Sequence, residues 1–381
     1  MSIKSAAAKE RTAIQATIAT FRLSLRSFAA KFLLLLGAAA ASAGADFPPV
    51  VPGHPIEFPR DAGSHPEFRT EWWYVTGWLE DESGASIGFQ QTFFRRRPGI
   101  DESNPSSFAA KQLLFAHVAI SDPRIGKLLT DERSARAGFG LAEAQSGGLN
   151  VSIDEWHLRH VGPGDARTYE ASASARGFSL QLSLQQTQPP LLQGDAGFSR
   201  KGPEELAASY YYSLPQLEVS GRLQIGDREH RVRGVAWMDH EWSTEIMDSQ
   251  AQGWDWAGVN LDDGGALMMF RMRGLDGKPR WAAATLSAGE PRKFQVQDVE
   301  WSPLRQWRSP RTGIEYPVEW RVRVGTRTIV LRPLMDDQEN DASGSTGTVY
   351  WEGAVRAFDE RNEMLGRGYL ELTGYGKKVR L

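Results

Sequence analysis

The chain has 381 residues, of which 41% are hydrophobic and 24% charged, and its formal net charge is −3. This is the composition of an ordinary globular protein, and the weakly acidic balance argues against a nucleic-acid partner. There is no cysteine, which excludes disulfide bonds and lipidation at a cysteine.

The first 45 residues have the features of a secretory signal peptide. They carry six basic residues and one acid, followed by the apolar run FLLLLGAAAASAGA at 32–45. The run ends in small residues that suit cleavage and is short for a membrane span, although an N-terminal membrane anchor is the alternative. We therefore expect residues 1–45 to be removed, leaving a periplasmic protein with a net charge of −8 and no stable membrane anchor.

The remaining chain is long for a single hydrophobic core, and we expect two domains, at 46–235 and 236–381. Apolar and polar residues alternate in FSLQLSLQ at 178–185 and in VEWRVRV at 318–324, which is typical of half-buried antiparallel strands. One short helix is predicted, over PEELAAS at 203–209. The pattern as a whole indicates an all-β protein built from barrels or sandwiches.

Two pairs of similar segments indicate that the halves of the chain are related. EWWYVTGWLED at 71–81 aligns without gaps with GWDWAGVNLDD at 253–263, and residues 220–238 resemble residues 352–372. In each half the tryptophan-rich segment comes early and the glycine-led strand comes last. Each unit has a suitable size for an eight-stranded barrel with a small ligand cavity.

The densest group of titratable and aromatic residues is WMDHEW at 237–242. On a strand, Asp239 would face one side, and His240 and Trp242 the other. In one interpretation the group moves a proton, because a carboxyl group walled by indole is desolvated and can act as an acid near neutral pH. In the other, Asp239 and Glu241 cap backbone amides at a polar corner. At the junction of two barrels, we expect the group to form one polar cluster facing an apolar cavity.

Two aromatic segments accompany this group. In GWDWAG, Trp254 and Trp256 share a face, with Asp255 opposite. These tryptophans either line a ligand cavity or fill the second barrel. The acid Asp255 is a further candidate for proton transfer.

In EWWY, Trp72 and Tyr74 share a face and Glu71 lies on the other. The aromatic residues either close a barrel end or contact a ligand. A buried Glu71 would need a cationic partner, for which Arg69 and Arg95 are candidates.

The sequence gives little support to metal sites or to a nucleophilic serine. His157 and His160 are three residues apart in a predicted strand and would face opposite sides. No G-x-S-x-G motif is present, so a serine hydrolase is not indicated. We expect no metal and no cofactor, and we interpret the basic run at 95–97 as an exposed strand end.

Five segments of the chain resemble one known family in matching order. They are HPEFRTEWWYVTGWL at 65–79, LLFAHVAISD at 113–122, LQGDAGFSRKG at 192–202, VRGVAWMDHEWS at 232–243 and YLELTGY at 369–375. Together they resemble the AttH and carotenoid 1,2-hydratase family of lipocalin-like proteins, often labelled predicted secreted hydrolases. The resemblance implies two lipocalin-like antiparallel β-barrels side by side, with a ligand site between them or in a barrel mouth.

The resemblance also implies chemistry. Activities in the wider family include water addition to isoprenoid alkenes, hydration of a plant phytoalexin and pericyclic cyclisation. In carotenoid hydratases a His-x-Trp pair and a downstream aromatic–acid pair have been considered for acid–base work. The matching positions here are His240, Trp242, Trp254 and Asp255, with the acid placed slightly differently.

We therefore predict a hydratase-type lyase or cyclase that acts on a hydrophobic, isoprenoid- or lipid-like molecule. Its predicted catalytic residues are Asp239, His240, Glu241 and Asp255. Its predicted substrate-binding residues are Glu71, Trp72, Tyr74, Trp242, Trp254 and Trp256. The alternative is a non-catalytic periplasmic carrier of a hydrophobic ligand, linked to an ABC-type export system, a context in which relatives occur.

Overall fold

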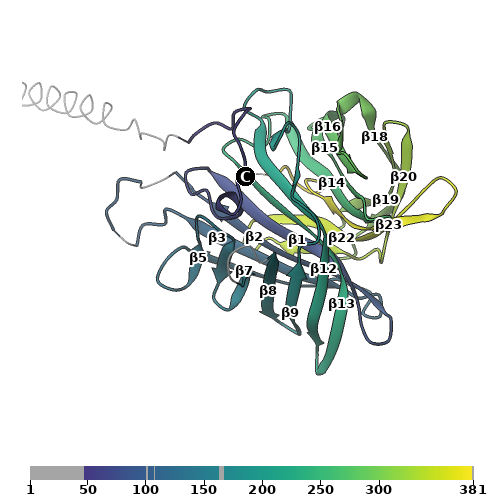
Figure 1. Ribbon diagram of the computed structural model, residues 1–381, viewed down its shortest axis with the longest axis horizontal. Coiled ribbons are helices and arrows are strands. Elements are labelled where there is room, and N and C mark those ends of the chain that lie inside the picture. Colours follow the sequence, from purple (N-terminus) through teal and green to yellow (C-terminus); the bar gives the residue numbers. More distant parts are fainter. Residues whose placement is uncertain (1–46, 100–101, 107, 163–166, 380–381) are drawn as a thin grey trace, which may run out of the picture. The chain divides into compact units, whose positions relative to one another are not determined.

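The computed structural model describes residues 47–379, apart from 100–101, 107 and 163–166. The signal peptide expected over residues 1–45 lies outside the described residues. Within the described part of the chain, no helix is long and apolar enough to cross a membrane. The architecture is all-β, with two large antiparallel sheets (Figure 1).

The first sheet has thirteen strands, and its main path follows the order β4-β3-β2-β1-β13-β12-β9-β8-β7-β6-β5. Two short strands, β10 and β11, pair with β12 beside this path. The strands are β1 (Thr70–Glu80), β2 (Ser86–Arg96), β3 (Leu113–Ser121), β4 (Leu129–Arg136), β5 (Ala142–Ala144), β6 (Asn150–Ile153), β7 (Trp156–Val161), β8 (Thr168–Ala175), β9 (Phe178–Gln185), β10 (Leu191–Leu192), β11 (Phe198–Arg200), β12 (Ala208–Ile225) and β13 (Arg228–Ser243).

The second sheet has ten strands in the order β17-β16-β15-β14-β23-β22-β20-β19-β18, with β21 paired to β22. The strands are β14 (Ala251–Leu261), β15 (Ala266–Gly274), β16 (Pro279–Ser287), β17 (Arg292–Phe294), β18 (Val299–Arg308), β19 (Glu315–Val324), β20 (Arg327–Pro333), β21 (Glu339–Ala342), β22 (Thr348–Phe358) and β23 (Met364–Leu372). Two 3-10 helices, η1 (Arg60–Ala62) and η2 (Val296–Asp298), complete the described elements.

The two sheets repeat the same strand order. Position for position, β1 corresponds to β14, β13 to β23 and β12 to β22. The segments that resemble each other in the sequence occupy these equivalent strands, so the sequence repeat corresponds to a repeat in topology. Strand β13 belongs entirely to the first sheet, so the chain passes from one sheet to the other within residues 244–250, slightly after the expected boundary at residue 235.

Each sheet curls around its own apolar core as a lipocalin-like barrel. Strand β4 lies against β6 in the first sheet and β16 against β18 in the second, which brings the two ends of each curl together. Trp73 belongs to the first core and Trp351 to the second. A third apolar cluster, which includes Trp78, Trp237 and Trp256, lies between the sheets.

The helix predicted over residues 203–209 is wrong. These residues form a bend and a turn, and strand β12 begins at Ala208. A seven-residue helix is only marginally stable by itself. Here the backbone of Ser209 and Tyr210 pairs with β11, which removes the end of the segment from any helix.

The close approach of the two sheets requires a glycine at position 88. A Cβ atom there would lie 2.7 Å from Cβ of Ala354 and 3.2 Å from Cβ of Ser121. We therefore expect Gly88→Val to overpack this contact and to lower the free energy of unfolding by about 1–3 kcal/mol, measured by urea denaturation. The matched control is Ser183→Val on an exposed position of β9, where we expect little change. Equal stability of the two variants would contradict the packing argument.

Candidate functional site

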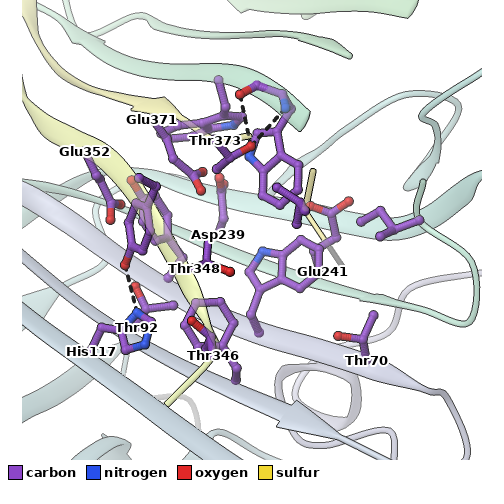
Figure 2. A pocket seen from close by; sticks show the side chains of 18 of the residues that line it. Thr70, Thr92, His117, Asp239, Glu241, Thr346, Thr348, Glu352, Glu371 and Thr373 are labelled. Atoms are coloured by element: carbon purple, nitrogen blue, oxygen red, sulfur yellow. Dashed lines mark hydrogen bonds between the residues drawn. The ribbon is translucent and has the colours of Figure 1, made fainter. Parts of the chain in front are cut away.

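A cavity of about 240 Å³ lies between the outer faces of the two sheets (Figure 2). Strands β1, β2, β3 and β13 form one side, and β14, β15, β22 and β23 form the other. The predicted ligand-binding residues Trp72, Tyr74, Trp254 and Trp256 all line it. The structure therefore places four of the six predicted binding residues around one space.

The pairing of the strands sets the acids of this cavity beside its aromatic side chains. In the first sheet, Tyr74 lies opposite Asp239. In the second sheet, the equivalent residue Trp256 lies opposite Glu371, which in turn lies opposite Glu352. Side chains that are opposite on adjacent strands point to the same face of a sheet. Carboxyl groups from both barrels therefore face the same cavity, as Figure 2 shows for Asp239, Glu352 and Glu371.

Asp239 is held by three hydrogen-bond donors. Ser213 Oγ donates to Oδ1 at 2.5 Å, Trp237 Nε1 donates to Oδ1 at 2.7 Å, and the Tyr211 hydroxyl donates to Oδ2 at 2.7 Å. Tyr211 is itself oriented by Trp256 Nε1, which donates to its hydroxyl at 3.0 Å. Burial raises the pKa of Asp239 to about 7, although these donors favour the ionised form.

The buried Glu352 and the half-buried Glu371 lie opposite each other on neighbouring strands. Burial raises the pKa of Glu371 to about 7, and burial together with the charge of Glu371 raises the pKa of Glu352 well above its usual range. Two carboxylates this close in a low-dielectric site do not ionise together readily. The pair therefore retains a proton at neutral pH and can serve as a proton donor.

Among the described residues, Glu241 is the one acid lining the cavity that has a salt bridge to a cationic side chain. Lys201 Nζ lies 2.7 Å from Glu241 Oε1, and the Ser209 hydroxyl donates to the same oxygen. The Lys201 ammonium also lies 4.5 Å from the ring centroids of both Tyr211 and Phe270. The predicted acid Glu241 therefore forms an ion pair with Lys201, and aromatic rings flank the Lys201 ammonium.

The cavity residues that the sequence analysis missed include Lys201, Glu352 and Glu371. The sequence contains a weak indication of the two glutamates, because each is the single acid within an otherwise largely apolar strand of the second repeat. The similarity of residues 220–238 to 352–372 did not supply the strand register that brings the two glutamates face to face.

His240 and Trp242 do not face the cavity, so the expected single polar cluster is divided between two environments. Both side chains point into the first barrel, where the His240 ring stacks on Trp73 at a centroid distance of 4.8 Å. His240 Nε2 lies 2.9 Å from Glu71 Oε1. Because successive residues of a strand point to opposite faces, His240 is separated from Asp239 by the sheet itself.

Glu71 is the centre of this second polar group. Arg95 Nε donates to its Oε2 at 2.7 Å, and His65 Nδ1 lies 2.7 Å from its Oε1. Burial disfavours the charged form of Glu71, but the charge of Arg95 and the bonds from His240 and His65 hold its pKa well below the usual range. The interpretation of Arg95 as part of an exposed strand end is wrong, since its side chain is 1% exposed.

The ligand atoms of His65, Glu71 and His240 lie within 4.8 Å of one another, the only such trio in the described part of the chain. They are already bonded to one another, and Glu71 is paired with Arg95. Burial lowers the pKa of His65, but hydrogen bonds and charges from Asp61 and Glu71 outweigh it and raise the pKa to about 9. A protonated His65 is an ion-pair partner for Glu71 and not a metal ligand.

Asp255 lies in a comparable position inside the second barrel and not in the cavity. Its partners are Arg271 Nε at 2.6 Å, Arg273 Nε at 3.2 Å and the Tyr375 hydroxyl, which donates at 2.9 Å. It sits opposite Arg271 across β14 and β15, as Glu71 sits opposite Arg95 across β1 and β2. Both acids are therefore paired with arginine at corresponding strands.

A family model described as AttH-like matches residues 49–375. The crystal structure of a candidate AttH from Nitrosomonas europaea shares 49% identity and has a TM-score of 0.80, covering 86% of this chain and 100% of that chain. Kievitone hydratase from Nectria haematococca shares 11% identity, with a TM-score of 0.63 over 87% of this chain and 96% of its own. CghA with Sch210972 shares 14% identity, with a TM-score of 0.52 over 81% and 89%. None of the curated proteins gives a significant sequence match.

Because Glu71 and Arg95 form a buried ion pair, we expect removal of either partner to reduce the stability of the fold strongly. We expect Glu71→Gln to lower the free energy of unfolding by about 3–5 kcal/mol, because it leaves the buried Arg95 guanidinium uncompensated. Arg95→Met in the same background should recover part of this loss in urea denaturation. The control Glu80→Gln removes a half-exposed pair with Arg367 and should cost less than about 1 kcal/mol. Strict additivity of the two substitutions would contradict the pairing.

The raised pKa of Asp239 predicts a pH-dependent effect on stability. The folded protein holds this proton more tightly than the unfolded chain, so the carboxyl group destabilises the fold progressively as pH rises from about 4 to about 7. Asparagine cannot ionise, so the melting temperature of Asp239→Asn relative to the wild type should increase between pH 5 and pH 8. The exposed variant Asp262→Asn is the control and should show no such trend. A constant difference for Asp239→Asn would mean that this group does not titrate near neutrality.

Proposed function

Because the chain belongs to the AttH-like family, we propose that it is a hydratase-type lyase that acts on a hydrophobic small molecule in the cavity between its two barrels. The observation that carries the proposal is the cavity's set of acids. Asp239 and Glu352 are buried and Glu371 is half-buried beside aromatic walls, and within the described residues none of the three has a salt bridge to a base.

The acids are suited to adding water to an alkene, because the Glu352–Glu371 pair retains a proton while three hydrogen-bond donors favour the carboxylate form of Asp239. A proton moves from the Glu352–Glu371 pair to one alkene carbon, so that a C–H bond forms as the π bond breaks. The faces of Tyr74 and Trp256 stabilise the resulting carbocation through their ring quadrupoles. Water then forms the C–O bond and gives its proton to Asp239, which returns it to the acid pair through solvent. Dehydration follows the same steps in reverse.

Two features of the cavity support this assignment over simple carriage of a ligand. A carrier needs the aromatic walls, but it gains nothing from unpaired buried acids, which cost stability when they ionise. An acid–base enzyme needs such groups, with pKa values close to the working pH. The fold is also that of kievitone hydratase, a protein that is a hydratase by name. We place the activity in the periplasm, after removal of residues 1–45.

The proposal predicts loss of activity at two positions. Chain lacking residues 1–45 is incubated with a panel of isoprenoid alkenes in oxygen-18 water, and labelled alcohols are detected by mass spectrometry. We expect Asp239→Asn and Glu371→Gln to reduce the rate by about 10²–10⁴-fold, since each removes one proton-transfer group. Asp262→Asn is the surface control and should retain the full rate. His240→Gln should change stability more than rate, because His240 lies on the other side of the sheet.

Native mass spectrometry of the protein from its own periplasm, followed by organic extraction, identifies the molecule that occupies the cavity. If one unmodified lipid is recovered and none of the tested alkenes incorporates oxygen-18, the protein is a carrier and not a hydratase. In that case Asp239→Asn should leave the bound lipid in place.

A further inference from the structure

One corner of the cavity has more hydrogen-bond acceptors than the protein fills. Tyr74, Gln90 and Glu352 line it, and their side chains are buried. The Tyr74 hydroxyl, Gln90 Oε1 and Glu352 Oε1 each lack a partner in full hydrogen-bonding geometry among the described residues, although the Tyr74 hydroxyl lies close enough to Glu352 for the two groups to interact. Buried polar atoms of this kind are normally bonded, so three in one corner of a cavity indicate a missing partner. We refer to these three residues as the acceptor corner.

The surroundings of the acceptor corner fix which groups remain free. Gln90 Nε2 donates to Thr92 Oγ1 at 2.7 Å, which leaves its Oε1 as an acceptor. Tyr350, a neighbour of Glu352 on β22, is bonded to His117 Nδ1 at 2.8 Å and accepts from Asn340 Nδ2 at 2.8 Å. The corner therefore offers a hydroxyl, an amide oxygen and a carboxyl oxygen to a ligand, and no basic side chain.

The same cavity already contains one ammonium group, that of Lys201, which is stabilised by a carboxylate and by aromatic rings. Lys201 Nζ is bound by Glu241 at 2.7 Å and by Ser199 Oγ at 3.1 Å, and two aromatic rings lie at 4.5 Å. The acceptor corner has the corresponding elements, a carboxyl group and aromatic rings, but lacks a cation of its own.

We propose that the acceptor corner binds the primary ammonium group of an amphipathic amine whose apolar part lies between the tryptophans. A primary ammonium has three N–H donors, equal in number to the three unfilled acceptors. The ammonium favours the ionised form of Glu352, so that the proton retained by the pair lies on Glu371, and the Tyr74 ring supplies a cation–π surface. The inference rests on the proposed function only in using the same cavity, and it names the class of substrate.

Two other occupants fit less well. A neutral alcohol has one donor and would leave two acceptors unfilled. A metal ion needs several ligand atoms converging on one point, and in the described part of the chain only His65, Glu71 and His240 bring three such atoms together. The acceptor corner is not part of that trio.

The binding of geranylamine and geraniol tests the proposal, because the two molecules differ only in the amine and the hydroxyl. Isothermal titration calorimetry at neutral pH should show geranylamine binding at least about tenfold more tightly, since the ammonium fills the acceptors and neutralises Glu352. Geranyl trimethylammonium keeps the charge without N–H donors and should bind at least about tenfold more weakly than geranylamine. Equal affinity of geranylamine for either comparison molecule would overturn the proposal.

Variants assign the effect to the acceptor corner. Glu352→Gln should reduce the affinity for geranylamine to the level of the affinity for geraniol. The affinity for geraniol itself should not change. Tyr74→Phe keeps the ring but removes the hydroxyl, and it should weaken the binding of geranylamine several-fold. Asp262→Asn is the surface control. Unchanged selectivity in both corner variants, with folding verified by melting temperature, would show that the amine binds elsewhere.

The two proposals can fail separately. If labelled water enters isoprenoid alkenes but geranylamine has no advantage, the amine inference is wrong and the hydratase proposal stands. If geranylamine is selected and no substrate takes up label, the ligand class stands and the hydration chemistry is wrong.

Discussion

The structure depends on one constraint: the central strands β1, β13, β14 and β23 are buried on both faces along the part that borders the cavity. One face of each strand packs inside its own barrel, and the other faces the opposite barrel. Consecutive residues therefore enter two buried environments that are separated by a sheet. In β1, Trp73 fills the first barrel while Tyr74 lines the cavity, and in β13 the same alternation separates His240 from Asp239. A charged residue on the doubly buried part of these strands has no route to solvent and must find a partner within the protein or in a ligand.

The two environments treat their acids differently. Inside the barrels Glu71 and Asp255 are each paired with an arginine on the neighbouring strand. In the cavity Asp239 and the two glutamates of the second barrel have no such partner among the described residues. Burial disfavours the charged form and raises the pKa of Asp239 and Glu371 to about 7 and the pKa of Glu352 well above its usual range. Fixed ion pairs stabilise a fold, whereas acids that titrate near pH 7 are suited to chemistry.

The sequence was sufficient for the all-β class, the alternation along the strands and the repeated order of segments, because period-two patterns survive without knowledge of the partner strand. It could not decide which face of WMDHEW meets the ligand. Both faces are apolar enough to be buried, so His240 and Asp239 look equivalent in a single strand. Glu352 and Glu371 become a pair only through the register of β22 with β23, which is a long-range property. The three-residue excess of acceptors near Tyr74 likewise depends on atoms from three strands.

The internal repeat explains how a symmetric scaffold supports an asymmetric site. Asp239 and Glu371 occupy equivalent positions, each opposite an aromatic residue of the first strand of its sheet. On the next strand, the residue opposite Asp239 is Ser213, whereas the residue opposite Glu371 is Glu352. A hydroxyl at this position donates to its neighbouring carboxylate and favours its charge. A carboxyl group at the same position repels that charge and keeps a proton in the pair. The first copy therefore pairs its acid with a hydrogen-bond donor, whereas the second copy pairs its acid with another carboxyl group, which raises the pKa of Glu352 well above its usual range.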